Sequence, residues 1–384
     1  MNNFNYQAST HIYFGRDQIK NLPAELLTYG KKVLLTYGGG SIKKNGLYDK
    51  IYDLLKDFDI TELSGIEPNP RLQTVEKGAK ICKEKDIEII LAVGGGSTMD
   101  CSKAIAAAAC YDGKAWDLVQ NPEMIQKALP VITITTMAAT GSEADMFGVI
   151  TNLETNEKLG MGSPLLMPKV AIMDPTYTFT VPENQTIAGI ADMMSHIMEV
   201  YFTKDNAYLS DRICEAALKT CIQYAPIVKE NPEDYDARAE ILWANTIAMN
   251  GVCSAGKVAS WSCHPMEHEL SAYYDITHGV GLAIITPQWM RYILSEETVD
   301  KFVEYAKNVW NIEGEDKYQV ANEGIKALED FFVSLNIPMH LSDLNITDEY
   351  FKVMAKHAVE VGGLKDAYVE LKPDDVYQIL KMCL

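Results

Sequence analysis

The hydrophobic pattern changes its character about halfway along the chain. Up to about residue 180, short apolar runs rich in β-branched residues alternate with stretches of helical periodicity. The runs that predict strands are Lys32–Tyr37, Ile87–Val93, Val131–Thr135 and Val170–Met173. Because strands that alternate with helices form parallel sheets, this half predicts an α/β domain with a doubly wound, mostly parallel sheet.

After Pro182 the strand pattern ends and long helical patterns follow, separated by Asn, Asp and Pro. The clearest of them are Glu183–Phe202, Tyr208–Lys229, Tyr235–Met249 and Asp316–Leu335. The sequence therefore predicts two domains: an α/β domain over residues 1–180 and an all-α domain over residues 181–384.

Composition narrows the class of protein. The 34 Lys and Arg against 53 Asp and Glu give a formal charge of −19, which repels nucleic-acid phosphates and anionic lipid surfaces. The first residues lack the basic and apolar regions of a signal peptide, and no apolar run reaches the roughly 18 residues of a spanning helix. The eight cysteines form no CxxC pair, which is typical of a reducing compartment. We expect a cytoplasmic protein that acts on a small molecule.

Three predicted strands run directly into loops that suit phosphate groups. These loops are YGGGS at 37–41, VGGGSTMD at 93–100 and TTMAATGSE at 135–143. Glycine lets backbone N–H groups approach an anion, and a following helix N-terminus adds a favourable dipole. A single loop of this kind is an ordinary turn more often than a ligand site, but several at the carboxyl ends of one sheet predict a dinucleotide site.

The first loop bears on which nicotinamide cofactor is used. Its sequence, GGGSIKKNG, has no carboxylate of the kind that holds an NAD ribose. Ser41, Lys43 and Lys44 would instead suit a ribose 2′-phosphate, although lysines there are equally typical of a solvated helix face. The sequence favours NADP(H) over NAD(H).

Histidines gather in the predicted helical half. Asp192 and His196 are four residues apart and so share one helix face. His264 and His278 could supply two further nitrogens. One carboxylate and three imidazoles suit a divalent ion such as Fe²⁺ or Zn²⁺. His268, one turn after His264, is either a further ligand, a proton relay or a structural residue, and we favour the relay.

The chain resembles the iron-containing (group III) alcohol dehydrogenase family, in particular its butanol dehydrogenase and broad-range aldehyde reductase branch. The resemblance runs through YGGGSIKKNG, GGGSTMDCSKAIA, TTMAATGSEAD, the Asp-x3-His pair and HPMEHELSAYYDITHGVGLAIITPQWM, in that order. It implies a dehydroquinate synthase-like architecture, and a homodimer or larger homo-oligomer. The family often has glycine at the position of Ala139, where this backbone would lie slightly farther from the cofactor.

Carried over position by position, the resemblance assigns roles to particular residues. The metal ligands fall on Asp192, His196, His264 and His278, and a conserved histidine near the nicotinamide falls on His268. The cofactor contacts fall on Gly38, Gly39, Ser41, Gly95, Gly96, Ser97, Asp100, Thr136, Thr140, Phe147 and Lys158, and we add Lys44 for a 2′-phosphate.

The implied reaction is the reversible reduction of a short-chain aldehyde such as butanal by NAD(P)H, with a metal ion as Lewis acid. Three alternatives remain open from the sequence: a metal-dependent hydrolase, a lyase that cyclises a sugar phosphate, and a glycerol-type polyol dehydrogenase. A hydrolase would leave the phosphate loops without a role. A sugar-phosphate lyase should carry Lys or Arg near the histidines, and HPMEHELSAYYDITHG has none.

Overall fold

The computed structural model describes residues 1–384, and their contacts divide them into two compact units. The sheet unit comprises residues 7–182 and 232–246. The helical unit comprises residues 1–6, 183–231 and 247–384. Residues 232–246 thus group with the sheet, although they lie within the range that the sequence assigns to the all-α domain.

The sheet unit is built on six parallel strands in the order β1-β8-β5-β4-β2-β3. The strands are β1 (His11–Phe14), β2 (Lys32–Tyr37), β3 (Asp59–Ser64), β4 (Ile89–Gly94), β5 (Val131–Thr135) and β8 (Val170–Met173). A separate antiparallel hairpin is formed by β6 (Phe147–Asn152) and β7 (Glu157–Gly162). The doubly wound parallel sheet predicted from the sequence is confirmed.

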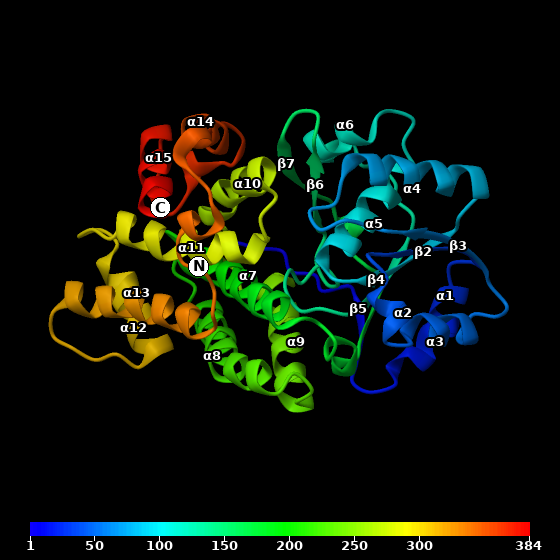
Figure 1. Cartoon of the computed structure of the whole chain (residues 1–384), viewed down its shortest axis with the longest axis horizontal. Helices are drawn as coiled ribbons and strands as arrows, with labels where there is room; N and C mark the ends of the chain where they lie inside the picture. The colour runs from blue at the N-terminus through cyan, green and yellow to red at the C-terminus, as the bar shows by residue number, and fades with distance from the viewer. The chain divides into compact units, whose positions relative to one another are not determined.

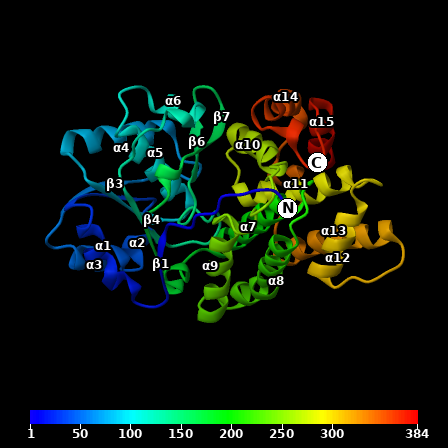
Figure 2. The ribbon, with the colours of Figure 1, turned by 180° about the vertical axis from the view of Figure 1, so that it is seen from behind.

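Helices cover both faces of this sheet, as Figures 1 and 2 show from opposite sides. They are α1 (Leu22–Leu27), α2 (Ser41–Lys44), α3 (Leu47–Leu54), α4 (Leu72–Lys85), α5 (Gly96–Ala108) and α6 (Ala115–Gln120). Along β2, Val33 and Leu35 pack with α1 and α3, whereas Leu34 packs with α4 and α5. Burial on both faces explains why the central strands are continuously apolar.

The helical unit holds α7 (Glu183–Tyr201) at its centre, in contact with α8 (Tyr208–Glu230) and α11 (His278–Ile293). Every residue of α7 from Thr186 to Tyr201 is buried, so this helix is enclosed all round. The remaining helices of this unit are α10 (Cys263–Tyr274), α12 (Val299–Trp310), α13 (Lys317–Ser334), α14 (Phe351–Val361) and α15 (Pro373–Met382). Helix α9 (Tyr235–Met249) begins in the sheet unit. None of the helices has the length and apolar character needed to cross a bilayer.

Candidate metal centre and nucleotide-binding loops

The four predicted metal ligands meet in the helical unit. Asp192 and His196 lie one turn apart on α7, His264 lies in the first turn of α10, and His278 begins α11. Oδ1 of Asp192 lies 3.3 Å from Nδ1 of His196. The same oxygen lies 3.9 Å from Nε2 of His264 and 3.7 Å from Nε2 of His278. One carboxylate oxygen is therefore within 4 Å of all three imidazoles.

The spacing and chemistry of these donors fit a divalent ion. Nε2 of His264 lies 3.0 Å from Nε2 of His196. Two ligand atoms about 2.1 Å from a tetrahedral ion would lie about 3.4 Å apart. That value lies between the 3.0 Å separating Nε2 of His264 from Nε2 of His196 and the 3.7 and 3.9 Å from Oδ1 of Asp192 to Nε2 of His278 and His264. Burial, with the nearby His264 and His278, lowers the pKa of His196 well below its ordinary value. His196 is thus neutral at pH 7, the form that binds a metal, and the donor set suits Fe²⁺ or Zn²⁺.

Two buried glutamates that the sequence analysis did not select complete this cluster. A carboxylate oxygen of Glu199, on α7, contacts Nδ1 of His264, and one of Glu267, on α10, contacts Nδ1 of His278. Donor atoms of Glu267, His268 and His278 also lie within 4.8 Å of one another. Nε2 of His278 faces Asp192, while Nδ1 faces Glu267. We therefore group His278 with Asp192, His196 and His264 as a proposed ligand. The sequence signal that could have identified Glu199 is its position inside the apolar run IMEVY, three residues after His196.

Glycines let α11 approach its neighbours closely. A Cβ at Gly279 would collide with the backbone carbonyl of Ala188 on α7. A Cβ at Gly281 would lie 2.8 Å from Cγ of Glu267. Backbone cannot move aside as a flexible side chain can, so Gly279 is required for the start of α11 to lie directly on α7. The close approach of α11 to α7 brings the side chain of His278 next to Asp192.

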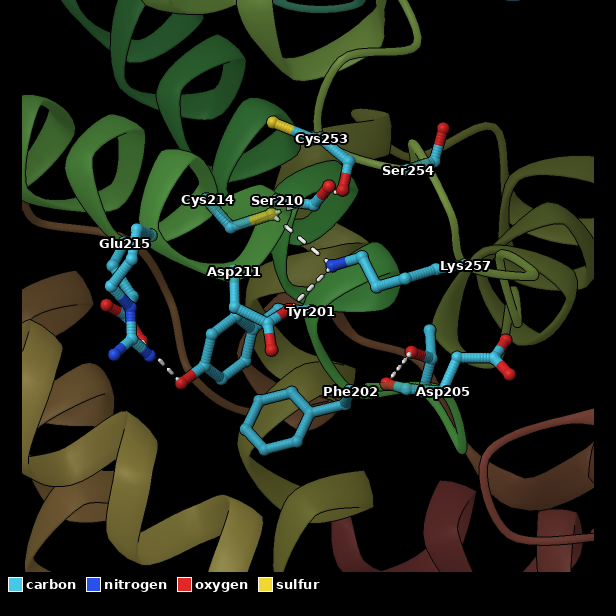
Figure 3. A network of polar contacts seen from close by, with 12 residues as sticks. Tyr201, Phe202, Asp205, Ser210, Asp211, Cys214, Glu215, Cys253, Ser254 and Lys257 are labelled. Carbon is cyan, nitrogen blue, oxygen red and sulfur yellow. Dashed lines mark hydrogen bonds and ion pairs between the residues drawn. The ribbon is translucent and has the colours of Figure 1, made fainter. Parts of the chain in front are cut away.

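The far end of α7 is anchored by a second buried polar network, shown in Figure 3. The hydroxyl of Tyr201, the last residue of α7, donates to Glu215 of α8 at 2.8 Å. Nearby, Nζ of the fully buried Lys257 donates to Asp211 at 2.8 Å and lies 3.8 Å from Sγ of Cys214. The Tyr201–Glu215 hydrogen bond joins the end of α7 to α8, and the Lys257–Asp211 ion pair, which gives a buried charge its partner, joins the segment after α9 to α8.

The three glycine-rich loops differ more than their sequences suggest. The first, after β2, leads into the four-residue helix α2. The second, after β4, opens the 13-residue helix α5. The third, after β5, leads into the hairpin strand β6 and not into a helix. The expectation of a helix N-terminus behind each loop is therefore wrong for the third, and only the second opens a long helix.

The second and third loops lie side by side. The N–H of Thr136 donates to the carbonyl of Gly94 at 3.0 Å. A Cβ at Gly96 would collide with the side chain of Thr140. A Cβ at Gly95 would meet only the side chain of Met137, at 3.4 Å or more, and the φ of Gly95 is −91°. The fold itself thus requires no glycine at position 95, and the absence of a side chain leaves the first N–H groups of α5 open.

Asp100 and the buried Lys103 tie α5 to the third loop. Asp100 accepts from the hydroxyl of Ser142 at 2.6 Å and from the N–H of Val149 at 3.0 Å. Nζ of Lys103 donates to Ser142 at 2.9 Å and to Asp145 at 2.7 Å. Burial raises the pKa of Asp100 to about 6. Lys103 is a residue that the sequence analysis missed, because a lysine in the helical run CSKAIA gives no sign of its burial.

The other predicted cofactor residues are distributed over the sheet unit. Ser97 is half-buried in the first turn of α5, and Ser41 and Lys44 are exposed on α2. Phe147 is 45% exposed at the start of β6, whereas Lys158 is buried on β7 opposite Thr151. A Cβ at Gly38 would lie 3.3 Å from the carbonyl oxygen of Ile66 and 3.9 Å from Oγ1 of Thr98, whereas a Cβ at Gly39 would meet nothing within 4 Å.

The fold, the cluster of donor side chains and the glycine-rich loops are the features expected of a metal-dependent, dinucleotide-binding enzyme. Family comparison agrees with this class. Residues 9–175 match a family model described as iron-containing alcohol dehydrogenase. Residues 186–384 match the C-terminal model of the Fe-containing alcohol dehydrogenase family. The chain therefore belongs to the iron-containing alcohol dehydrogenase family and is an oxidoreductase that acts on alcohols.

Individual relatives are similar over almost the whole chain. The chain is 52% identical to NADH-dependent butanol dehydrogenase A of Clostridium acetobutylicum, covering 99% of each protein. It is 38% identical to the NADPH-dependent aldehyde reductase YqhD of Escherichia coli, covering 94% of each. A crystal structure of NADH-dependent butanol dehydrogenase A from Thermotoga maritima is 39% identical, with a TM-score of 0.95 over 100% of this chain and 99% of that one. The predicted resemblance is confirmed.

Proposed function

We propose that this protein reduces short-chain aldehydes such as butanal to alcohols, reversibly, with a nicotinamide dinucleotide. The proposal rests on one observation: four donor side chains lie together in one cluster, namely Asp192, His196, His264 and His278. These four side chains would hold the metal, which when bound supplies Lewis acidity toward a carbonyl oxygen. A polyol substrate is the alternative within the same chemistry.

We further propose that His268 relays a proton to the alcohol oxygen. Its ring centroid lies 6.1 Å from that of His264 and 5.6 Å from that of His278, so it stands beside the ligands. The residue is half-buried, with Nε2 enclosed by the protein, so only part of the ring is accessible to solvent. His268→Gln should keep its metal, lose about 10²-fold in kcat and change the pH dependence of kcat. A variant with the parent rate and pH profile would contradict the relay.

We propose that the dinucleotide is held by the three loops of the sheet unit, with the pyrophosphate at Gly95, Gly96 and Ser97. The N–H groups at the start of α5 are open to an anion, and the helix dipole favours it there. For the rest of the cofactor we propose the contacts that the family resemblance implies, which come from Gly38, Gly39, Asp100, Thr136, Thr140, Phe147 and Lys158.

For the choice of cofactor we propose NADP(H), with Ser41 and Lys44 as donors to the 2′-phosphate. Nζ of Lys43 lies 4.4 Å from the ring centroid of Tyr48 and 5.3 Å from that of Tyr37. Lys43 therefore contacts aromatic faces, and Lys44 is the second exposed lysine of α2. The relatives' names include both cofactors, so the proposal rests on this loop and not on them.

A cofactor-oxidation screen tests the function. The metal-stripped protein is reloaded with Fe²⁺ or Zn²⁺ and assayed with NADH and NADPH against aldehydes of increasing length, with glycerol and 1,3-propanediol in the oxidative direction. We expect aldehyde reduction only with metal, and the largest kcat/KM for a short linear aldehyde. Exclusive oxidation of polyols would favour the alternative, and metal-independent turnover would contradict the proposed chemistry.

The cofactor choice is tested by Gly39→Asp. The position has open space around it, so the substitution should not disturb the fold. A carboxylate beside a 2′-phosphate repels it, and we expect the ratio of kcat/KM for NADPH to that for NADH to fall by about ten- to a hundredfold. A parent enzyme that already prefers NADH, or a ratio that the substitution leaves unchanged, would contradict the assignment of Ser41 and Lys44.

The eight cysteines are all unpaired thiols, and we propose a reducing cytoplasm as the setting, because thiols persist there.

We also propose that the protein forms a homodimer or larger homo-oligomer, on the basis of the family resemblance. Light scattering of the purified protein would contradict the second proposal if it gave the 42.8 kDa of one chain.

A further inference from the structure

Two buried glutamates, Glu199 and Glu267, contact Nδ1 of His264 and of His278. We propose that Glu199 and Glu267 are positioning residues that hold His264 and His278 with Nε2 unprotonated and turned toward the metal. This inference rests on the proposed metal site and adds to it the residues that set its affinity. Both side chains have no solvent exposure.

The chemistry of imidazole makes these contacts directional. A neutral imidazole carries one proton, and a carboxylate can only accept a hydrogen bond. A carboxylate at Nδ1 therefore holds the proton on Nδ1 and leaves the lone pair on Nε2. In both histidines Nε2 is the atom that faces Asp192. The two glutamates thus select the one tautomer in which both rings can bind a metal, and the negative charge behind each ring makes it a better donor.

Glu199 also fixes the backbone that carries His264. Its Oε1 accepts from the backbone N–H groups of Ser262, Cys263 and His264, while Oε2 contacts the ring of His264. The first N–H groups of a helix have no partner within the helix. Glu199 supplies that partner for α10 from α7, the same helix that bears Asp192 and His196. One side chain therefore sets the position of His264 relative to two other ligands.

Glu267 is held at both of its carboxylate oxygens. Oε1 accepts from the hydroxyl of Ser271, one turn along α10, at 2.5 Å, and Oε2 contacts Nδ1 of His278. Gly281 provides the space for this side chain, since a Cβ there would lie 3.0 Å from Oε1. With both oxygens engaged, Glu267 cannot turn away from His278, so the ring of His278 is oriented before any ion binds.

The test measures metal affinity in Glu199→Gln and Glu267→Gln. The amide removes the charge, and its NH₂ can donate to Nδ1, which would move the ring proton to Nε2. We expect each substitution to raise the Zn²⁺ dissociation constant about 10- to 100-fold in competition with a chelator. The visible spectrum of the Co²⁺-loaded proteins should change as well, because the geometry of the ligands changes.

The chain offers a matched control on the same helix. Glu269 of α10 is also buried and contacts Nδ1 of a histidine, His357, at 2.6 Å. His357 is not among the proposed ligands. Glu269→Gln therefore removes an equivalent carboxylate–imidazole contact and should leave Zn²⁺ affinity and the Co²⁺ spectrum unchanged. Thermal unfolding of the metal-free proteins shows whether each variant is folded.

A milder variant keeps the proposal testable if a glutamine variant does not fold. Ser271→Ala removes the hydroxyl that holds Glu267 and leaves every charge in place, and we expect a several-fold weaker Zn²⁺ affinity. Parent-like affinity in all the folded variants, or an equal loss in Glu269→Gln, would overturn the positioning role. A parent protein that itself fails to bind Zn²⁺ or Fe²⁺ would instead overturn the proposed function.

Discussion

Replacing His278 with alanine is expected to abolish bound metal and aldehyde reduction together. The imidazole is one of the four proposed donors, and its Nε2 lies 3.7 Å from Oδ1 of Asp192. Loss of a partner behind a ligand costs about 10- to 100-fold in metal affinity, and loss of the ligand itself should cost more. The measurement is elemental analysis of the dialysed variant, together with kcat for butanal after reloading.

The matched control for this variant is His340→Ala. His340 is exposed, precedes a short helical turn and contacts none of the ligand cluster. It should retain a full equivalent of metal and the parent turnover. If His278→Ala also retained a full equivalent of metal with normal turnover, the assigned ligand set would be wrong.

Placing valine at Gly95 is expected to weaken cofactor binding by about two orders of magnitude. The side chain would occupy the space over the first N–H groups of α5, where the pyrophosphate is proposed to bind. A hydrogen bond to a charged group contributes about 1.5–3 kcal/mol, and each 1.4 kcal/mol is a factor of ten in affinity. Displacing the pyrophosphate from these N–H groups therefore accounts for an effect of that size. The dissociation constant is measured by fluorescence titration with NADPH and NADH.

Metal content provides the internal control for Gly95→Val. The φ of −91° is accessible to valine, and only the Met137 side chain lies near the added Cβ. The variant should therefore fold and hold its metal in the helical unit like the parent. Unchanged cofactor affinity in a folded variant would show that this loop is an ordinary turn.

The sequence alone was sufficient for elements with a regular hydrophobic pattern. The strands Lys32–Tyr37, Val131–Thr135 and Val170–Met173 have the predicted bounds, because strands buried on both faces are predominantly apolar and rich in β-branched residues. Helices α7, α8, α9 and α13 begin and end within one residue of their predicted bounds. The edge strands β1 and β3 were missed, since each pairs on one side only and carries exposed polar residues.

The local sequence also pointed to the four proposed ligands, because Asp192 and His196 share a helix face and the other two histidines lie near each other in the chain. Only the tertiary structure decided what surrounds them. Glu199 contacts His264 across 65 positions, and that partner depends on how α7 and α10 pack. Glu267 was one of several acidic residues near the histidines, and only the folded chain separates it from Glu269, which contacts His357. Residue type and spacing specify which side chains are able to bind a metal, whereas the packing of helices distant in sequence determines which atom of each ring is left free to do so.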